Sequence, residues 1–351
     1  MNPRCVLLIV CSDRRTMTNR RVVLASRPEG EPSAANFRLE TTETGPLHEG
    51  DVLLRTLYLS IDPYMRGRMS DGPSYAAPVA IGEVMVGATV CEVVESQLPG
   101  LQPGQIVSAF TGWQEYAVVP GRGLRKLEQG KGPVSLALGV LGMPGLTAYT
   151  GLLNIGDPKQ GETVVVSAAA GAVGAVVGQI AKLKGCRTVG IAGGPEKCRY
   201  VVEELGFDAC VDHRSPTLYD DLKAACPAGV DVYFENVGGK VLESVLPRMN
   251  DFSRMPVCGL ISQYNQTELP PGPDRTAVLM RAVLTKRIRI QGFIVLDYAS
   301  QMSDFLRDVS GWLRDGKIRY KEDIVDGLEN APEALFGVLQ GRNFGKMLVR
   351  F

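Results

Sequence analysis

Residues 164–174 read Val-Val-Val-Ser-Ala-Ala-Ala-Gly-Ala-Val-Gly, and Gly178 follows about one helical turn later. The β-branched run predicts a buried strand, and the small residues after it predict a tight turn into a helix. Such a turn lets the backbone approach a pyrophosphate, which then faces the free N–H groups of the helix start. Alanine replaces the first glycine of the usual G-x-G-x-x-G pattern, and a small-residue turn can also serve helix–strand packing alone. The stretch therefore predicts a strand–turn–helix unit and leaves its ligand to the surrounding sequence.

Strands and helices alternate around this unit, from Ser135 onward. The helical segments between the strands are long enough to be crossovers between parallel strands. We therefore expect an α/β protein with a doubly wound parallel sheet of the Rossmann type, with helices on both faces. The expected strands are 163–167, 188–192, 209–212, 230–235, 255–261 and 287–295, and the helices lie near 172–184, 196–205, 217–226, 240–248 and 275–285.

The N-terminal part has short strands and turns, which predict a compact, barrel-like β domain. Residues 59–69 contain Pro63 and Gly67, so this irregular segment is either a pocket wall or a surface loop. Helical spacing over 136–149 is interrupted by Met143-Pro144-Gly145, and a last strand at 346–351 is placed to return to the first domain. The other expected elements are strands at 20–25, 37–42, 51–60, 84–94 and 113–120 and helices at 300–316 and 331–339.

Composition excludes several classes of protein. Lys plus Arg and Asp plus Glu number 38 each, so no broad basic field favours nucleic acid or an anionic membrane. No apolar run approaches the roughly 20 residues of a membrane span. Eight cysteines form no C-x-x-C pair and there are two histidines, which predicts reduced thiols of a cytoplasmic protein and no metal site. We expect residues 1–16 to be a disordered or non-native extension, with Met17 as the start.

The strand at 188–192 ends in Gly193-Gly194, without the acid that binds the adenosine ribose of NAD. Lys197 follows, and a cation at an acid-free strand end suits the 2′-phosphate of NADP, although Glu196 stands beside it and Lys197 also fits a solvated helix start. Asn236 follows the strand 230–235, at the carboxyl edge of the sheet where such folds bind ligands. The sequence therefore predicts an NADP-binding edge.

A set of long and unusual motifs extends over nearly all of residues 19–351. Together they resemble the zinc-independent medium-chain dehydrogenase/reductases, in the branch of the curcumin and prostaglandin reductases. The motifs are L-S-I-D-P-Y-M-R-G-R-M (59–69), G-V-L-G-M-P-G-L-T-A-Y (139–149), A-A-A-G-A-V-G (168–174), E-N-V-G-G-K (235–240), C-G-L-I-S-Q-Y-N (258–265), L-P-P-G-P-D-R (269–275) and N-F-G-K (343–346).

This resemblance implies a GroES-like β-rich catalytic domain (17–138 and 311–351) interrupted by a Rossmann domain (139–310) that binds NADPH. It places the pyrophosphate at 171–174 and the 2′-phosphate at Lys197. Much of the family has tyrosine where this chain has His213, beside the adenosine. The implied cofactor residues are Gly171, Ala172, Val173, Gly174, Lys197, His213, Asn236, Cys258, Gly259, Leu260, Ile261, Ser262, Gln263, Tyr264, Phe293, Ile294, Val295 and Asn343.

The resemblance further implies reduction of the carbon–carbon double bond of α,β-unsaturated ketones or aldehydes. Such a site must supply a donor to the enolate oxygen, and Tyr264 and then Tyr64 are the expected catalytic residues, with the cofactor ribose hydroxyl as a further donor. Tyr64 serves equally well as pocket packing. A quinone reductase and a non-enzymatic NADPH-binding protein are the alternatives. The family also implies a homodimer, for which the strand at 287–295 is a candidate pairing edge.

Overall fold

The nucleotide-binding sheet of this computed structural model consists of six parallel strands in the order β10-β9-β8-β11-β12-β13. The structure describes residues 16–128, 130, 132–269 and 272–351. The strand order is that of a complete Rossmann sheet, so the predicted fold is confirmed. The strands are β8 (Thr163–Ser167), β9 (Arg187–Ala192), β10 (Ala209–Asp212), β11 (Val230–Phe234), β12 (Met249–Val257) and β13 (Arg289–Gly292).

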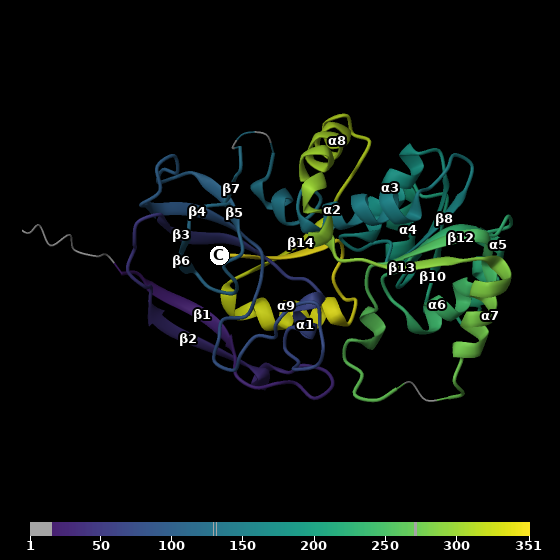
Figure 1. The fold of residues 1–351 in the computed structure, drawn as a ribbon, viewed down its shortest axis with the longest axis horizontal. Helices are drawn as coiled ribbons and strands as arrows, with labels where there is room; N and C mark the ends of the chain where they lie inside the picture. The colour runs from purple at the N-terminus through teal and green to yellow at the C-terminus, as the bar shows by residue number, and fades with distance from the viewer. Residues whose placement is uncertain (1–15, 129, 131, 270–271) are drawn as a thin grey trace, which may run out of the picture.

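Helices cover both faces of this sheet (Figure 1). Successive residues of β8 show why, because Val164 and Val166 belong to one core cluster and Val165 to another. Both faces of the strand are buried, as the continuous apolar run predicts. Helices α2 (Met143–Thr150), α3 (Gly174–Leu183), α4 (Pro195–Glu203) and α8 (Met302–Arg314) contribute to the first cluster, and α5 (Leu218–Ala225), α6 (Gly239–Val245) and α7 (Thr276–Lys286) to the second.

The second sheet combines the two ends of the chain, and the yellow C-terminal segment runs among the purple and blue strands in Figure 1. Its order is β14-β15-β3-β4-β5-β7, with β6 also paired to β3. The predicted return of the last strand is confirmed, because β15 pairs antiparallel with β3. The strands are β3 (Asp51–Ser60), β4 (Thr89–Ser96), β5 (Ile106–Ala109), β6 (Tyr116–Pro120), β7 (Arg125–Lys126), β14 (Glu322–Asp326) and β15 (Lys346–Arg350); β1 (Thr18–Leu24) and β2 (Phe37–Glu43) form a separate pair, and α9 is Ala331–Leu339.

Several predicted boundaries are wrong for local reasons. Strand β12 ends at Val257, because the residues after it form a turn. Residues 143–145 begin α2 instead of interrupting it, since Pro144 lies in the first turn, where no N–H is needed. The irregular segment contains a short helix, α1 (Tyr64–Gly67). The expected extension at residues 1–16 lies, apart from its last residue, outside the described residues.

The expected domain boundary at 310/311 falls inside α8. Phe305 and Val309 of this helix are fully buried in the core cluster that contains α3, and Trp312 packs against the same cluster. We therefore propose that the nucleotide-binding domain extends through α8, and that the catalytic domain resumes before β14. None of the helices in the described ranges combines the length and hydropathy needed to span a bilayer.

Candidate functional site

The turn between β8 and α3 ends at Gly174, where the backbone lies so close to the end of β8 that glycine is needed. A Cβ at Gly174 would lie 2.4 Å from the carbonyl oxygen of Ala168, whose own φ is +51°. Gly171 forms a parallel bridge with Gly345, whose amide donates to the Ala170 carbonyl oxygen at 3.1 Å. Small residues thus keep the start of α3 free of side-chain bulk, as a bound pyrophosphate requires.

Gly178 has a different role, in packing. A Cβ at this position would lie 1.8 Å from Cζ of Phe207, so the absent side chain makes room for the ring. The sequence left open whether the small residues form the turn or serve helix–strand packing. Both apply, because Gly174 allows the tight turn and Gly178 makes room for a core side chain.

The loop after β9 is where a ribose-binding acid would stand. A Cβ at Gly193 would lie 2.8 Å from Nε2 of His213 and 3.4 Å from Nη2 of Arg214, so both side chains lie over this loop. Asp212 accepts hydrogen bonds from the amides of Gly194 and Arg214, both at 2.9 Å. The Asp212 carboxylate, at the end of the neighbouring strand β10, is therefore engaged by the loop backbone, and His213 and Arg214 lie over the loop.

Lys197 lies in the first turn of α4, and its Nζ donates to the carbonyl oxygens of Gly341 at 2.8 Å and Asn343 at 2.5 Å. Burial, and then the charge of Arg214, lower the pKa of Lys197. The same two causes lower the pKa of His213, so its imidazole is neutral at pH 7. Two cations beside an acid-free strand end suit a 2′-phosphate. Arg214 is absent from the predicted site, although its position two residues after the third strand, beside His213, was a usable signal.

Asn236 is held at the strand edge by β8. Its amide nitrogen Nδ2 donates to the Ser167 carbonyl oxygen at 2.8 Å, and its backbone N–H donates to Ser167 Oγ at 2.8 Å. Glu235, which the sequence places only as a strand end, is fully buried and organises the same loop. Its Oε1 accepts from Ser167 Oγ at 3.0 Å and from the amides of Val237 at 2.6 Å and Gly238 at 3.0 Å.

The 258–264 turn rests on the loop that follows β11. The Ser262 amide donates to the Val237 carbonyl oxygen at 3.0 Å, which fixes the two loops together. The Tyr264 hydroxyl accepts from the Leu260 amide at 3.3 Å, and a Cβ at Gly259 would lie 2.9 Å from that hydroxyl oxygen. Burial raises the pKa of Tyr264, so its hydroxyl stays protonated and retains a hydrogen to donate.

Tyr64 lies at the start of α1, in the other domain. Among the described residues, its buried hydroxyl and the buried Nε of Arg68 have no hydrogen-bond partner. Burial, and then the charge of Asp62, raise the pKa of Tyr64, whereas Arg68 acts in the opposite direction. Two unsatisfied polar groups in one region call for a ligand or water to satisfy them.

Tyr75 connects the two predicted tyrosines. The residue is 60% exposed. Burial of its hydroxyl, and then Cys258, raise the pKa of Tyr75 while Arg68 lowers it, and Tyr75 in turn adds to the raised pKa of Tyr64 and of Tyr264. The structure therefore brings the segment around Tyr64 and the 258–264 turn together. Arg68 and Tyr75 were missed as site residues, because only tertiary contact marks them; Arg68 does lie within the quoted 59–69 motif.

Arg66 joins the two domains beside these tyrosines. Its Nε donates to Asn265 Oδ1 at 3.0 Å, its Nη2 to the Gly30 carbonyl oxygen at 2.7 Å, and its Nη1 to Ser70 Oγ at 2.7 Å. The side chain is almost fully buried, with the residue 5% exposed. Arg66 thus fixes α1 to the residue that follows Tyr264.

The remaining predicted cofactor residues have mainly structural contacts in the structure. Phe293 packs edge-on against Phe234. A Cβ at Gly151 would lie 2.3 Å from Cζ of Phe293. Asn343 Nδ2 donates to the Gly345 carbonyl oxygen at 2.8 Å, which orders the segment that bridges to the glycine-rich turn. Ile294, Val295 and Phe293 form the segment directly after β13.

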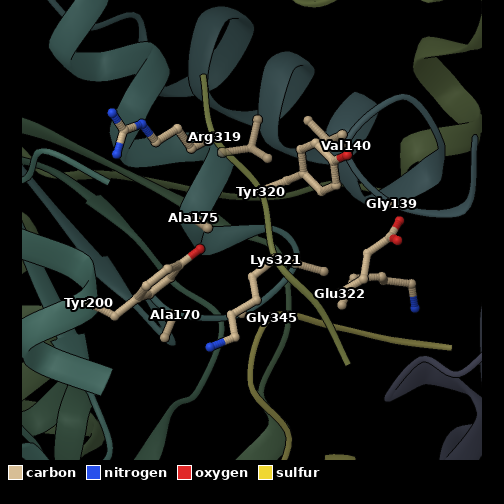
Figure 2. Close-up of a pocket in the computed structure, with 14 residues that line it drawn as sticks. Gly139, Val140, Ala170, Ala175, Tyr200, Arg319, Tyr320, Lys321, Glu322 and Gly345 are labelled. Atoms are coloured by element: carbon tan, nitrogen blue, oxygen red, sulfur yellow. The ribbon is translucent and has the colours of Figure 1, made fainter. Parts of the chain in front are cut away.

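A pocket lies behind the glycine-rich turn, between α3, the 319–322 segment and the C-terminal strand (Figure 2). Its wall includes Gly171 and Ala172, but Asn236 and the 258–264 turn do not line it. The Lys321 ammonium lies 3.7 Å from the centre of the Phe344 ring. Neither Tyr64 nor Tyr264 lines this pocket, which is thus separate from the expected catalytic residues.

Together these features define an oxidoreductase with a β-rich part and a dinucleotide-binding sheet of the Rossmann type. Within the described part of the chain, no three His, Cys, Asp or Glu residues cluster as ligands for a metal ion.

Comparison of the sequence and the structure with known proteins supports this class of protein. The family descriptions "N-terminal domain of oxidoreductase" and "Zinc-binding dehydrogenase" match residues 20–127 and 172–310. The chain is 59% identical to NADPH-dependent curcumin reductase of Escherichia coli, over 95% of this chain and 96% of that protein. It is 46% identical to prostaglandin reductase 1 of Rattus norvegicus, over 92% and 96% of the two chains. The crystal structure of CurA from Vibrio vulnificus in complex with NADPH matches with a TM-score of 0.92 and 56% identity, over 94% of this chain and 98% of that one.

The chain belongs to the zinc-independent medium-chain dehydrogenase/reductase family, in the branch of the curcumin and prostaglandin reductases.

Proposed function

We propose that this protein uses NADPH to reduce the carbon–carbon double bond of α,β-unsaturated ketones and aldehydes. One observation carries the proposal: the unpartnered Tyr64 hydroxyl and Arg68 Nε lie on the segment that Arg66 joins to Asn265, the residue after Tyr264. The relatives named for curcumin and prostaglandin reduction support the same class of reaction.

NADPH fits the residues that are present. The cradle at 171–174 would hold the pyrophosphate, and Lys197 with Arg214 would hold the 2′-phosphate, with neutral His213 beside them. Asn236, the 258–264 turn, 293–295 and Asn343 remain the proposed contacts along the rest of the cofactor. When bound, NADPH supplies the hydride that the β-carbon of the substrate accepts.

Negative charge then develops on the carbonyl oxygen of the substrate, and the tyrosine hydroxyls donate hydrogen bonds to that oxygen. The pKa values of Tyr64 and Tyr264 are both raised, chiefly by burial, so both hydroxyls are neutral donors at physiological pH and not bases. The Tyr64 hydroxyl has no hydrogen-bond partner among the described residues, and the Tyr264 hydroxyl accepts from the Leu260 amide, so the hydrogen of each hydroxyl remains free to donate. We therefore propose both tyrosines as donors to this oxygen, Tyr264 first and Tyr64 second, as expected from the sequence.

A homodimer is the assembly that we propose, through β13 and α7. Strand β13 is an edge strand whose residues are all exposed, and α7 has no buried residue. Leu284 is 77% exposed and Val278 62% exposed, which is costly for an apolar face without a partner. We also propose a cytoplasmic location, which the six described cysteines support because they are free thiols.

Purified protein tests the reaction directly. NADPH or NADH is supplied with 3-nonen-2-one, or with a small quinone in place of the enone, and the loss of absorbance of the reduced cofactor is followed. We expect enone turnover with NADPH to be much faster than with NADH. Tyr64→Phe should lower kcat about 100- to 1,000-fold if the hydroxyl stabilises the enolate. Tyr219→Phe, on exposed α5, is the matched control and should be neutral.

Two results would overturn the proposal. Turnover of the quinone without turnover of the enone would make this a quinone reductase. NADPH binding without turnover of either compound would make it a non-enzymatic NADPH-binding protein.

A further inference from the structure

The ring of Phe344 packs against α4, the helix that carries Lys197. We propose that Phe344 is a positioning residue for recognition of the 2′-phosphate, because its ring holds in place the carbonyl groups that anchor Lys197. The inference rests on the cofactor site proposed above. It assigns part of the preference for NADPH over NADH to a side chain that acts through Lys197.

Main-chain atoms of the C-terminal segment hold the ammonium group of Lys197. Its Nζ donates to the carbonyl oxygens of Gly341 at 2.8 Å and Asn343 at 2.5 Å. A lysine ammonium has three N–H donors, so these two bonds among the described residues leave one donor for a phosphate oxygen. The position of the two carbonyl groups therefore determines where the remaining N–H points.

The Phe344 ring joins this segment to α4 by several contacts. It meets the ring of Tyr200 edge-on, with the ring centroids 4.8 Å apart, and Tyr200 lies three residues after Lys197 on the helix. The ammonium groups of Lys321 and Lys197 lie over the Phe344 ring at 3.7 Å and 6.0 Å from its centroid, a cation–π arrangement. Lys321 also lies over the Tyr200 ring, at 5.4 Å (Figure 2).

Hydrogen bonds hold the backbone on either side of the ring. The Phe344 amide donates to Asp323 Oδ2 at 3.0 Å, and the Gly345 amide donates to the Ala170 carbonyl oxygen at 3.1 Å. Gly345 has a φ of +81°, and a Cβ there would lie 2.2 Å from the Lys321 carbonyl oxygen. These bonds do not involve the ring, so a smaller side chain at Phe344 loosens the packing on α4 and leaves the rest of the segment attached.

Comparison of the two cofactors separates this role from general packing, because NADH lacks the 2′-phosphate. The affinity of the full-length protein for each cofactor is measured by fluorescence titration. We expect Phe344→Ala to raise the Kd for NADPH about 3- to 30-fold, part of the contribution of a charged hydrogen bond, and to leave the Kd for NADH unchanged.

A double-mutant cycle tests whether the effect passes through Lys197. Lys197→Met retains most of the apolar stem and removes the ammonium. Adding Phe344→Ala to this variant should change the Kd for NADPH by less than about twofold, because the coupled group is already absent.

A second phenylalanine supplies the matched control. Phe252, on β12, lies beneath Arg287, whose guanidinium carbon is 4.4 Å from the ring centroid. Phe252→Ala removes a similar cation–π contact and should leave the affinities for both cofactors unchanged. If Phe344→Ala does not fold, Phe344→Leu decides by the same comparison, because it keeps an apolar side chain and loses the aromatic face.

Three results would overturn the inference. Equal weakening of NADPH and NADH would give Phe344 a packing role alone, and unchanged NADPH affinity would leave it no role in recognition. An undiminished effect in the Lys197→Met background would exclude the route through Lys197. All these readouts are binding constants, so a protein that binds NADPH but reduces no enone would contradict the proposed function and leave this inference standing.

Discussion

Replacement of Lys346 by methionine tests whether the return of the C-terminal strand is secured by a buried charge pair. The side chains of Lys346 and Asp62 are 4% and 7% exposed, and Nζ lies 2.9 Å from Asp62 Oδ1. Nζ also donates to the Ile61 carbonyl oxygen at 2.7 Å. The pair joins β15 to the residues that lead into α1 and Tyr64.

The expected cost follows from what the substitution leaves behind. Methionine retains most of the apolar stem of lysine, so the loss is electrostatic. Among the described residues, the Asp62 carboxylate would remain buried with the Ser60 hydroxyl as its side-chain donor, and the Ile61 carbonyl oxygen would lose a donor. Breaking a buried pair in this way costs about 3–5 kcal/mol. Adding Asp62→Asn should recover part of the loss, because the unpaired charge is then removed.

The same strand supplies a matched control. Arg350, at the other end of β15, pairs with Asp326 at 2.6 Å, but these side chains are 52% and 69% exposed. Arg350→Met should therefore cost far less stability than Lys346→Met, because exposed ion pairs contribute little. Urea unfolding followed by fluorescence measures both, since the indole of Trp113 is fully buried in the catalytic domain.

The reasoning is refuted if Lys346→Met costs no more than Arg350→Met. It is also refuted if adding Asp62→Asn makes the Lys346 variant less stable still. Either result would mean that burial does not determine how much this ion pair contributes to the free energy of unfolding.

Four further predictions follow from single contacts. Arg214→Gln should raise the NADPH KM about 10- to 100-fold and leave the NADH KM unchanged, because charged hydrogen bonds contribute about 1.5–3 kcal/mol; equal effects on both cofactors would contradict the 2′-phosphate assignment. Gly178→Ala should lower the unfolding free energy by about 1–3 kcal/mol despite the higher helix propensity of alanine, whereas Gly337→Ala, with no atom within 4 Å of the added Cβ, should not. Leu284→Glu should shift the protein from dimer to monomer in light scattering, and an unchanged mass would exclude this face. Since burial raises the pKa of Tyr64, kcat should show no loss from tyrosine ionisation as pH rises from 6 to 10, and a fall centred below 10 would count against a neutral donor.

Local patterns predicted the nucleotide-binding sheet well for a physical reason. Strands β8 and β10 have the expected bounds because apolar runs and turn residues mark both ends. Strand β14 was missed, since Glu-Asp-Ile-Val-Asp is mostly polar and is specified by pairing with β15. Its position depends on a partner more than 20 residues away, which no local pattern records.

The candidate site shows the same limit at the level of single side chains. Sequence position alone placed Asn236 at the correct edge of the sheet, because carboxyl ends of parallel strands meet there. It could not show that Nδ2 of Asn236 is already committed to Ser167, or that Glu235 holds the loop. Tyr64 and Tyr264 are 200 residues apart in the sequence, and only the folded chain shows that the Leu260 amide donates to the Tyr264 hydroxyl while the Tyr64 hydroxyl has no partner among the described residues. The order of the strands thus largely determines which residues lie at a site. Whether the polar atoms of those residues remain free depends on neighbours that only the folded chain brings together.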